Sequence, residues 1–573
     1  MEPFVLPGQG PVAIWGGDRS DFPALSHAGD DIGKDGAASP GPLQTVFIAS
    51  GKIHLERALS DKIPFVVLGR GWTDPLSLRT IRKAGAAGVR IVGPGSAGVV
   101  TPFLSGSADG NTALLAEGYD AFLHVLSMAH RSGVPLRYAL SFGDGGGYSF
   151  LEAARSIFEH DPAVDLYVFV VKTLREGRAL LDFAEIAAGR GKRTALLQLS
   201  RTEGEQIEED ALFRQYDVVV LGEPSDIVDG AAVFLHSPRP KGKRVHCIAP
   251  SKELDGLLRR EASALGFECC GDREAADILL EIGTSCTVRP QSGQAHVRTT
   301  VEQCPGGTAR GTSCPPLVPG IGRSVRAMQL AAFPRRTTHE ALRRPPRVTT
   351  CPVHRRMERD AKIYLASYDI PIAKEKLCRS YPAALAAAEE IGYPVALKVL
   401  SPSILYKTEA RVIALNLHDE EELRNAYGRT LEKARLADPK ADIRGVLVQE
   451  MIYGGTEWRM EFHRDSRFGP IVGVGISGAY REFLPDWVIR GAPFDEEEAL
   501  EMIRESKGYP LLLEGWNRPA LDVDGFAAAL SSFSRLAYCE KDVARIEVHP
   551  LFVTSSGVLV VDAFIEAGAR RKK

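Results

Sequence analysis

The chain has 573 residues, of which 44% are hydrophobic and 25% are charged, and its formal net charge is -3. This length exceeds what a single hydrophobic core usually serves, so we expect about three to five domains. The nearly neutral charge balance gives no electrostatic case for binding nucleic acid or an anionic membrane, so we expect small-molecule partners.

Short strand patterns alternate with helical patterns through the first 240 residues. Runs such as PVAIWGG, TVFIAS, FVVLGRG and VRIVGPG end at or next to glycine, and amphipathic segments separate them. This alternation favours parallel sheets covered by helices. We expect one such domain at residues 1–102, a second at 103–240, from runs such as RYALSFGDGGG and YDVVVLG, and a third at 241–335.

The periodicity weakens between about residues 283 and 356, where Gly, Pro, Ser, Thr and Arg dominate. This composition is typical of loops, so we expect the third domain to be degenerate and residues 336–358 to form a linker. Beyond it, ALKVLSPSILYKTEARVIALNL has the pattern of a hairpin, as does RIEVHPLFV with GVLVVDAFI. Paired strands mixed with helices predict an α+β domain at 359–573 behind the parallel-sheet domains.

Phosphate-binding signals are sparse. No GxxxxGK[ST] run occurs, which argues against a P-loop enzyme. The stretch GPGSAG at 93–98 follows a strand pattern, so its amides could approach a pyrophosphate, although glycine turns close many such strands. The last hairpin would bring Glu547, His549 and Asp562 together. Adjacent strands often supply the carboxylates that hold magnesium on a nucleotide, and the plain alternative is an exposed hairpin edge.

Nine cysteines are scattered without a repeated CxxC spacing, which predicts reduced thiols rather than disulfides or a zinc site. The opening residues MEPFVLPGQGPVAIWGG have no basic region followed by an apolar core. No apolar run of about 18 residues suggests a membrane span. The sequence therefore predicts a cytoplasmic protein with no membrane partner.

Six blocks between about Ala361 and Ile565 carry a family resemblance. They are YLASYDIPIAKEKL, AALAAAEEIGYPVALKVLSPSILYKT, IRGVLVQEMIYGGTEW, RDSRFGPIVGVGISGAYREFLPD, YPLLLEGWNRPALD and IEVHPLFV with GVLVVDAFI. In this order they resemble the ATP-grasp domain of ADP-forming acyl-CoA synthetases, relatives of the succinyl-CoA synthetase β subunit. PVAIWGG to GVRIVGPGSAGVVTP is similar to the family's Rossmann-like CoA-binding domain, and YALSFGD to DALFRQYDVVVL to its flavodoxin-like second domain.

The resemblance implies ATP and Mg²⁺ as cofactors and assigns residues to the nucleotide. Lys398 matches a lysine that contacts nucleotide phosphate. Arg490 matches an arginine that the family directs at the phosphates, and its alternative is a salt-bridge partner. Glu450 and Met451 fall in the hinge segment that receives adenine, although Glu450 could instead be a surface residue. Glu457 matches a carboxylate beside the nucleotide.

The metal site and the phosphate-facing loops are matched in part. Asp562 corresponds to a magnesium ligand, and His549 replaces its usual asparagine partner, with Glu547 two residues earlier. Lys407 keeps the place of a second lysine at the nucleotide. Residues 473–478 are expected to form a glycine-rich loop near the transferring phosphoryl group.

Coenzyme A binding is implied by the first domain. The family's GPNC motif reads Gly93, Pro94, Gly95 and Ser96 here, which makes Gly93, Gly95 and Ser96 the expected CoA contacts. Residues 17–43 leave little room for the usual first helix and second strand. The domain is therefore predicted to be truncated, and CoA is an expected cofactor if its site is retained.

The chain departs from the family at both histidines of its phosphate relay. The first histidine lies in an SHTG-like stretch of the second domain, but here LSRTEGEQIEEDALFRQYD runs almost directly from one flanking block into the next. The second lies in an HKTD-like stretch, where this chain has Tyr406 in YKTE. A phenol is protonated at neutral pH and its phosphate ester is a poorer donor than phosphohistidine, so we expect no histidine relay.

These observations predict an ADP-forming ligase that activates a small carboxylic acid as an acyl phosphate, with Lys398, Arg490 and the metal stabilising the transferring phosphoryl group. The acyl acceptor is CoA if the front half binds it, or an amine if that half has been repurposed. A catalytically impaired homologue, acting as a nucleotide- or acyl-CoA-binding regulatory or assembly subunit, is the alternative. Relatives that assemble as dimers or heterotetramers suggest a homodimer.

Overall fold

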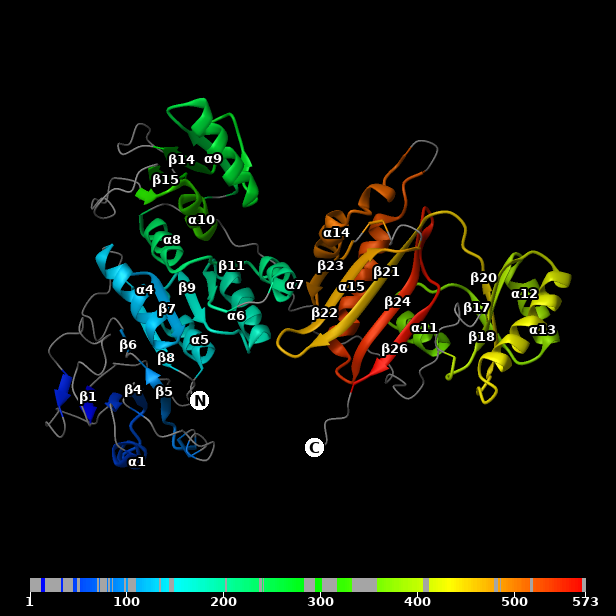
Figure 1. Ribbon diagram of the computed structural model, residues 1–573, viewed down its shortest axis with the longest axis horizontal. Coiled ribbons are helices and arrows are strands. Elements are labelled where there is room, and N and C mark those ends of the chain that lie inside the picture. Colours follow the sequence, from blue (N-terminus) through cyan, green and yellow to red (C-terminus); the bar gives the residue numbers. More distant parts are fainter. Residues whose placement is uncertain are drawn as a thin grey trace. The chain divides into compact units, whose positions relative to one another are not determined.

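The structure is a computed structural model. Its chain forms two compact units, which comprise residues 1–338 and residues 339–573 (Figure 1). Each unit is described by itself. The residues that the structure describes are 12–15, 32–34, 45–48, 52–69, 72, 80, 83–84, 86–96, 99–100, 110–132, 136–143, 149–200, 203–236, 240, 242–282, 294–300, 317–331, 358–404, 412–478, 483–484, 486–515 and 519–568.

The first sheet is parallel and has the strand order β2-β1-β3-β4-β5. Its elements are β1 Val12–Trp15, β2 Ile32–Lys34, β3 Thr45–Ile48, α1 Lys52–Ser60, β4 Phe65–Gly69 and β5 Arg90–Ser96. A three-residue strand, β2, is present within residues 17–43, where the sequence leaves little room for a second strand. Three residues suffice for it, since an edge strand pairs with one neighbour only.

The second sheet has the order β11-β10-β9-β7-β8-β6, in which only β6 is antiparallel to its partner. Its elements are β6 Val99–Val100, β7 Thr112–Glu117, α4 Tyr119–Arg131, β8 Tyr138–Gly143, α5 Phe150–His160, β9 Leu166–Val171, α6 Gly177–Gly189, β10 Arg193–Gln198, α7 Glu203–Gln215, β11 Val218–Val220 and α8 Pro224–His236. Ser149 and Glu152 form a capping box that begins α5. Strand β6 thus joins this sheet although it precedes residue 102.

The third sheet is parallel, with the order β13-β12-β14-β15-β16. Its elements are β12 Arg244–Ile248, α9 Lys252–Ala264, β13 Glu268–Cys269, β14 Ile278–Ile282, β15 Ala295–Thr300, β16 Leu317–Pro319 and α10 Ile321–Ala331. Three of these elements lie where the sequence predicted loop. The pattern was misleading because Glu281 and His296 are buried together at 2.9 Å, which places polar residues inside strands.

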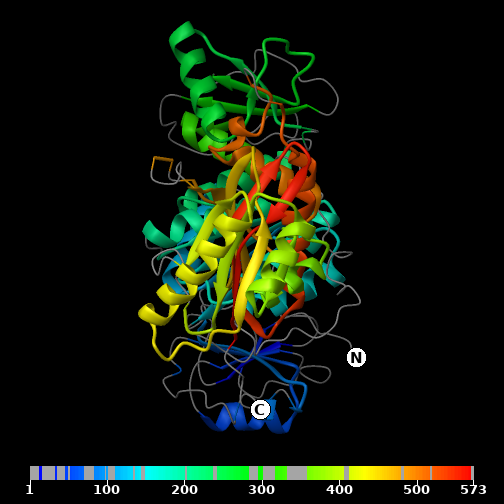
Figure 2. The ribbon, with the colours of Figure 1, turned by 90° about the vertical axis from the view of Figure 1, so that its right-hand side faces the viewer.

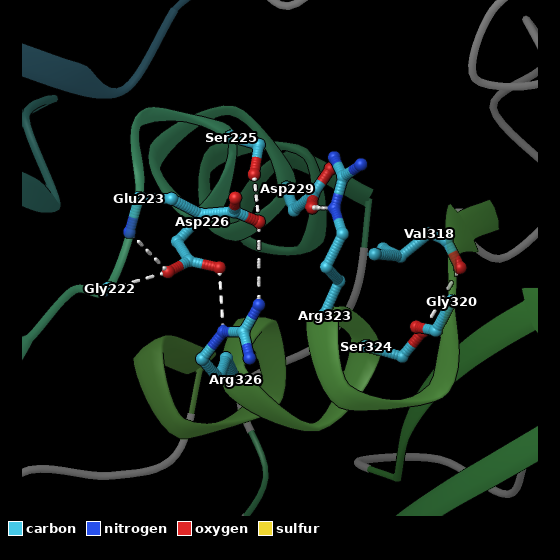
Figure 3. Close-up of polar contacts among 10 residues, drawn as sticks. All are labelled: Gly222, Glu223, Ser225, Asp226, Asp229, Val318, Gly320, Arg323, Ser324 and Arg326. Atoms are coloured by element: carbon cyan, nitrogen blue, oxygen red, sulfur yellow. Dashed lines mark hydrogen bonds and ion pairs between the residues drawn. The ribbon is translucent and has the colours of Figure 1, made fainter.

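Helices α8 and α10 are joined by ion pairs that connect the second and third sheets (Figure 3). Arg326 Nε donates to Asp226 Oδ1 at 2.8 Å, and Arg323 Nε donates to Asp229 Oδ2 at 2.7 Å. The other oxygen of the buried Asp226 accepts a hydrogen bond from Gly222 N at 2.9 Å, just before α8 begins. One carboxylate therefore both caps α8 and anchors α10.

The C-terminal unit contains two antiparallel sheets. Its elements are α11 Glu358–Ala366, β17 Glu375–Cys378, α12 Tyr381–Ile391, β18 Val395–Leu400, β19 Ile413–Leu417, α13 Glu420–Ala437, β20 Gly445–Glu450, β21 Thr456–Asp465, β22 Gly469–Ile476, β23 Val488–Gly491, α14 Glu496–Glu505, the 3-10 helix η5 Tyr509–Leu511, α15 Val523–Cys539, β24 Val543–Thr554, β25 Gly557–Val560 and β26 Ala563–Ala567. The small sheet has the order β17-β20-β18-β19. The large sheet has the order β23-β22-β21-β24-β25, and β26 also pairs with β24.

The small sheet is covered by α12 and α13, which lie against the same face (Figures 1 and 2). Ser380 caps α12 and Asp419 caps α13, each accepting a backbone hydrogen bond from the first turn. The predicted hairpin is present: Lys398 on β18 lies opposite Ile413 on β19.

The large sheet has two different faces. On β21 the side chains of Trp458, Met460 and Phe462 are buried in the core with α14 and α15. Glu457 and Arg459 alternate with them and are only partly buried. We call these sides the helix face and the open face of the large sheet, and each later residue is assigned to one of them from its register.

The expected fold class is confirmed, with parallel sheets in the first unit and an antiparallel α+β second unit. Among the described residues, no helix combines the length and the apolar character needed to cross a membrane.

Replacing Asp226 with alanine should loosen α10 from α8. The variant loses a charge-assisted hydrogen bond and a helix cap, which together contribute about 1–3 kcal/mol. Hydrogen exchange measured by mass spectrometry should be faster in α8 and α10 and unchanged in the second unit. Asp255→Ala is the matched control, because it removes a half-exposed i,i+4 partner of Arg259. Equal exchange in both variants would contradict this assignment.

Candidate functional site

Lys398 is buried on β18, with 4% of its surface exposed. Its Nζ donates to Glu358 Oε1 at 3.1 Å and to the backbone carbonyl of Val561 at 3.1 Å. Lys362, one helical turn after Glu358 on α11, donates to the same carboxylate oxygen at 2.7 Å and to the same carbonyl at 3.0 Å. Two ammonium groups therefore meet on one carboxylate and one carbonyl.

Glu375 and Gln449 complete this arrangement. Glu375 forms an ion pair with Lys362, and Gln449 Nε2 donates to Glu375 Oε2 and to the Val561 carbonyl, both at 3.1 Å. Burial raises the pKa of Glu375, and the charge of Lys362 opposes that effect. We call Glu358, Lys362, Glu375, Lys398 and Gln449 the buried lysine cluster. It joins α11 and the small sheet to the segment between β25 and β26 of the large sheet.

Glu450 is the residue after Gln449 and ends β20. Its Oε1 accepts a hydrogen bond from Lys374 N at 2.6 Å, and its own N donates to Lys374 O at 3.0 Å. Met451 follows and is half-buried. The predicted hinge residues therefore adjoin the buried lysine cluster through the chain itself, and the Glu450 carboxylate has a fixed partner rather than being free at the surface.

Glu457 lies on the open face at the start of β21. Gly478 has a φ of +65°, which favours glycine, and a Cβ added there would be 2.7 Å from Glu457 Oε2. Ser477 N donates to Glu457 O at 2.8 Å, and this bond fixes the backbone just before Gly478 next to the backbone of Glu457. The predicted nucleotide-side carboxylate thus faces the end of the glycine-rich segment.

The expectation of a glycine-rich loop at 473–478 was wrong for its first part. Gly473 and Gly475 lie within β22, paired with Glu461 and Arg459. A Cβ at Gly473 would be 2.2 Å from the indole of Trp487. A Cβ at Gly475 would be 2.2 Å from a backbone carbonyl oxygen in the same segment. These glycines make space for the segment before β23, not for a flexible turn.

Arg490 lies on the helix face, because it pairs with the core residue Val472. Its Nε donates to Glu498 Oε1 at 2.5 Å and its Nη2 to Glu505 Oε1 at 2.7 Å, both on α14. Glu457 is on the other face of the same sheet. The structure does not bring Arg490 to the other predicted nucleotide residues, and the salt-bridge alternative fits its contacts.

Of the three predicted metal ligands, Glu547 and His549 lie on β24, and Asp562 lies in the connection between β25 and β26. Glu547 on β24 pairs with Glu461 on the open face, and its carboxylate forms an ion pair with Arg545. His549 N donates to Asp562 O at 3.1 Å. Among the described residues no three His, Cys, Asp or Glu side chains form a metal-binding group.

The predicted CoA contacts lie at the end of β5. A Cβ at Gly93, with φ +95°, would be 2.3 Å from the carbonyl oxygen of Leu68, so the two strands approach closely only because of this glycine. Gly95 lies in the same strand. Ser96 is buried, and its Oγ donates to Ser141 O at 2.6 Å. This hydroxyl therefore connects the first two sheets.

Two predicted positions, Tyr406 and Lys407, lie outside the described residues. Conversely, the sequence analysis missed Lys362, Glu358 and Glu375. Glu358 and Lys362 have the i,i+4 spacing of an ordinary surface pair on a helix, and nothing in that spacing distinguishes a buried pair. Only the contacts with Lys398 on β18 and with the Val561 carbonyl show that this pair is buried.

The family of ATP-grasp domains matches residues 352–566. The β subunit of acetate–CoA ligase (ADP-forming) I from Pyrococcus furiosus is 35% identical over 207 residues, which are 36% of this chain and 89% of that subunit. The β subunit of ligase II from the same organism is 37% identical over 212 residues, 36% of this chain and 90% of that subunit. The chain belongs to the ADP-forming acetate–CoA ligase family.

Membership of this ligase family confirms the ATP-grasp assignment of the C-terminal unit. A solved member, the acetyl-coenzyme A synthetase 1 of Ca. Korarchaeum cryptofilum, is 32% identical, covers 38% of this chain and 94% of its own, and has a TM-score of 0.33. That structure contains coenzyme A and Mg-AMPPCP, and its phosphohistidine segment points towards the nucleotide-binding site.

Replacing Lys362 with methionine should destabilise the second unit strongly. The substitution leaves the buried Glu375 without its ion-pair partner, a change that costs about 3–5 kcal/mol. Urea unfolding followed by circular dichroism measures the loss. Lys376→Met is the matched control, since Lys376 follows Glu375 on β17, is half-exposed, and pairs with Glu390, which is also exposed. A similar midpoint for the two variants would show that the buried contacts add little.

Replacing Arg490 with methionine should lower stability without weakening nucleotide affinity in the folded protein. Glu498 would be left buried without its guanidinium, at a cost of about 3 kcal/mol or more. Thermal unfolding and calorimetric titration with Mg-ADP separate the two effects. A large loss of affinity in a variant that melts normally would restore Arg490 to the phosphate site.

Proposed function

We propose that this chain is an ATP-dependent, ADP-forming ligase that activates a carboxylic acid as an acyl phosphate and transfers the acyl group without a phosphohistidine. The observation that carries the proposal is the shared Val561 carbonyl. This carbonyl accepts a hydrogen bond from Lys398 Nζ, and Val561 directly precedes Asp562 in the chain. A cation for phosphate and a carboxylate for magnesium are thereby placed next to each other.

The residues present suit a magnesium nucleotide. Asp562, Glu547 and His549 would hold the ion, which when bound neutralises phosphate charge and orients the terminal phosphoryl group. Lys398 contributes a positive charge from the small sheet. Glu457 contributes an acceptor on the open face, and the backbone beside Glu450 supports the adenine. The relatives that match this unit are acid–CoA ligases.

The proposed reaction has two displacements. A substrate carboxylate oxygen attacks the γ-phosphorus of ATP, the bond to the β-phosphate oxygen breaks, and ADP leaves. The acceptor then attacks the acyl carbon, and inorganic phosphate leaves with the electron pair of the acyl–oxygen bond. Lys398 stabilises the charge on the transferring group in the first step.

Direct transfer is supported by the connection between β10 and α7. Strand β10 ends at Gln198 and α7 begins at Glu203, so only LSRT joins them, and this tetrapeptide contains no histidine. Family members use a phosphohistidine segment, as the Korarchaeum protein illustrates. A thiol of CoA or an amine would therefore have to reach the acyl phosphate itself. The relatives are acid–CoA ligases, which favours CoA as the acceptor, and the close approach of β5 to β4 at Gly93 supports a role for the first sheet in binding it.

The second candidate is a nucleotide-binding homologue with impaired catalysis. The observation in its favour is that Lys398 already has a buried carboxylate partner, Glu358. A nucleotide phosphate would then displace Glu358 from Lys398, and no reaction would follow. Such a subunit would bind Mg-ATP and release no ADP.

An ADP-release assay over a panel of carboxylic acids distinguishes the two. Hydroxylamine traps the acyl phosphate as a hydroxamate, and parallel reactions contain CoA or amines. ADP and hydroxamate are the expected products, and Lys398→Ala and Asp562→Ala should remove both. Tyr406→Phe should have a smaller effect than either.

Three results would change the assignment. AMP in place of ADP would exclude acyl phosphate chemistry, and a stable phosphohistidine formed from labelled ATP would restore the relay. No ADP with any acid, in a chain that binds Mg-ATP, would favour the impaired homologue. Equal loss from Tyr406→Phe would give that phenol a role in the reaction.

A further inference from the structure

Arg545 bridges two carboxylates on the open face of the large sheet. It lies on β24, which pairs with β21 on one side and with β26 on the other (Figure 1). Its Nε donates to Glu461 Oε1 on β21 at 2.8 Å, and its Nη2 forms an ion pair with Glu547 Oε1 on its own strand. One guanidinium therefore holds acidic side chains from two neighbouring strands.

The register of the strands explains why a cation is needed at this position. Glu461 and Glu547 are direct cross-strand partners, and like charges in that arrangement repel each other. Arg545 lies two residues before Glu547 and therefore on the same face. Its own cross-strand partner on β26 is a third acidic residue, Glu566. The arginine thus neutralises a part of the sheet that would otherwise be strongly negative.

Glu547 has a second role in the proposed function, as one of the residues that would hold Mg²⁺. A guanidinium and a divalent cation are attracted to the same carboxylate, and they repel each other. Binding of the ion by Glu547 and pairing of Glu547 with Arg545 therefore oppose each other.

The contacts of Arg545 allow Glu547 to be released. The side chains of Arg545 and Glu547 are 42% and 40% exposed, so their ion pair is much weaker than one in the protein interior. If Glu547 turns away, the guanidinium keeps its hydrogen bond to Glu461, and Glu566 remains its neighbour on β26. The arginine is therefore not left without a counter-charge, and Glu547 can exchange between the two cations at little cost.

We propose that Arg545 competes with the Mg²⁺ of the bound nucleotide for Glu547 and thereby sets the Mg²⁺ concentration at which the nucleotide binds. The inference rests on the proposed function, because it describes the regulation of the same nucleotide site. Arg545 is a positioning residue, since it acts through Glu547 and contacts neither the nucleotide nor the ion.

The test measures the affinity of the full chain for the β,γ-methylene analogue of ATP by calorimetric titration at a series of free Mg²⁺ concentrations. Arg545→Met should lower the Mg²⁺ concentration that gives half of the maximal gain in affinity. The expected shift is about two- to fivefold, which corresponds to the loss of one exposed ion pair. A general loss of positive charge would have the opposite effect, because it would weaken the binding of an anionic nucleotide complex.

A double variant shows whether Arg545 acts through Glu547. In a chain that already carries Glu547→Gln, adding Arg545→Met should leave the Mg²⁺ dependence unchanged, because the carboxylate for which the two cations compete is absent. Arg424→Met is the matched control for the single variant. Arg424 is an exposed arginine that pairs with Glu420 at 2.6 Å on α13, and its loss should not alter the Mg²⁺ dependence. Thermal unfolding of each variant checks that it is folded.

The outcomes separate this inference from the proposed function. An unchanged or higher Mg²⁺ requirement in folded Arg545→Met would overturn the inference, and so would an equal shift in the Glu547→Gln background. A wild-type chain that did not bind the analogue, or bound it equally with and without Mg²⁺, would instead contradict the nucleotide or metal site of the proposed function, and the role of Arg545 would fail with it.

Discussion

One backbone carbonyl organises the C-terminal unit. Val561 O accepts hydrogen bonds from Lys362, Lys398 and Gln449, at 3.0, 3.1 and 3.1 Å. The donors come from α11 and the small sheet, whereas Val561 belongs to the connection between two strands of the large sheet. Because an unpaired ammonium group in the interior is so costly, this contact fixes the geometry of both sheets near Asp562. Every role assigned to the nucleotide site depends on that geometry.

The alternation of side chains along the strands decides which of these residues can act together. The sequence correctly placed Lys398 in a hairpin and His549 next to Asp562 in the chain's last strands, since these follow from short-range strand patterns. It could not assign Arg490, because the face of a strand is set by its register with the neighbouring strand. A shift of one residue would have placed Arg490 with Glu457.

In the first unit, the parallel sheets were predictable where their strands are apolar on both faces, as in β9 and β4. Prediction failed at β15, because the buried pair of His296 and Glu281 interrupts the apolar pattern. It also failed for the Ser96 hydroxyl, whose bond to Ser141 spans 45 residues and leaves no local signal. In both units, therefore, the long-range polar contacts could not be predicted from the sequence.

The recess under Trp487 has a consequence for how this protein can vary. Gly473 lies beneath the indole so closely that a side chain at 473 needs a smaller residue at 487, whereas a smaller residue at 487 removes the steric reason for glycine at 473. The two positions are 14 apart in the sequence and are linked by this contact. Related chains with a small residue at 487 are expected to tolerate alanine at 473.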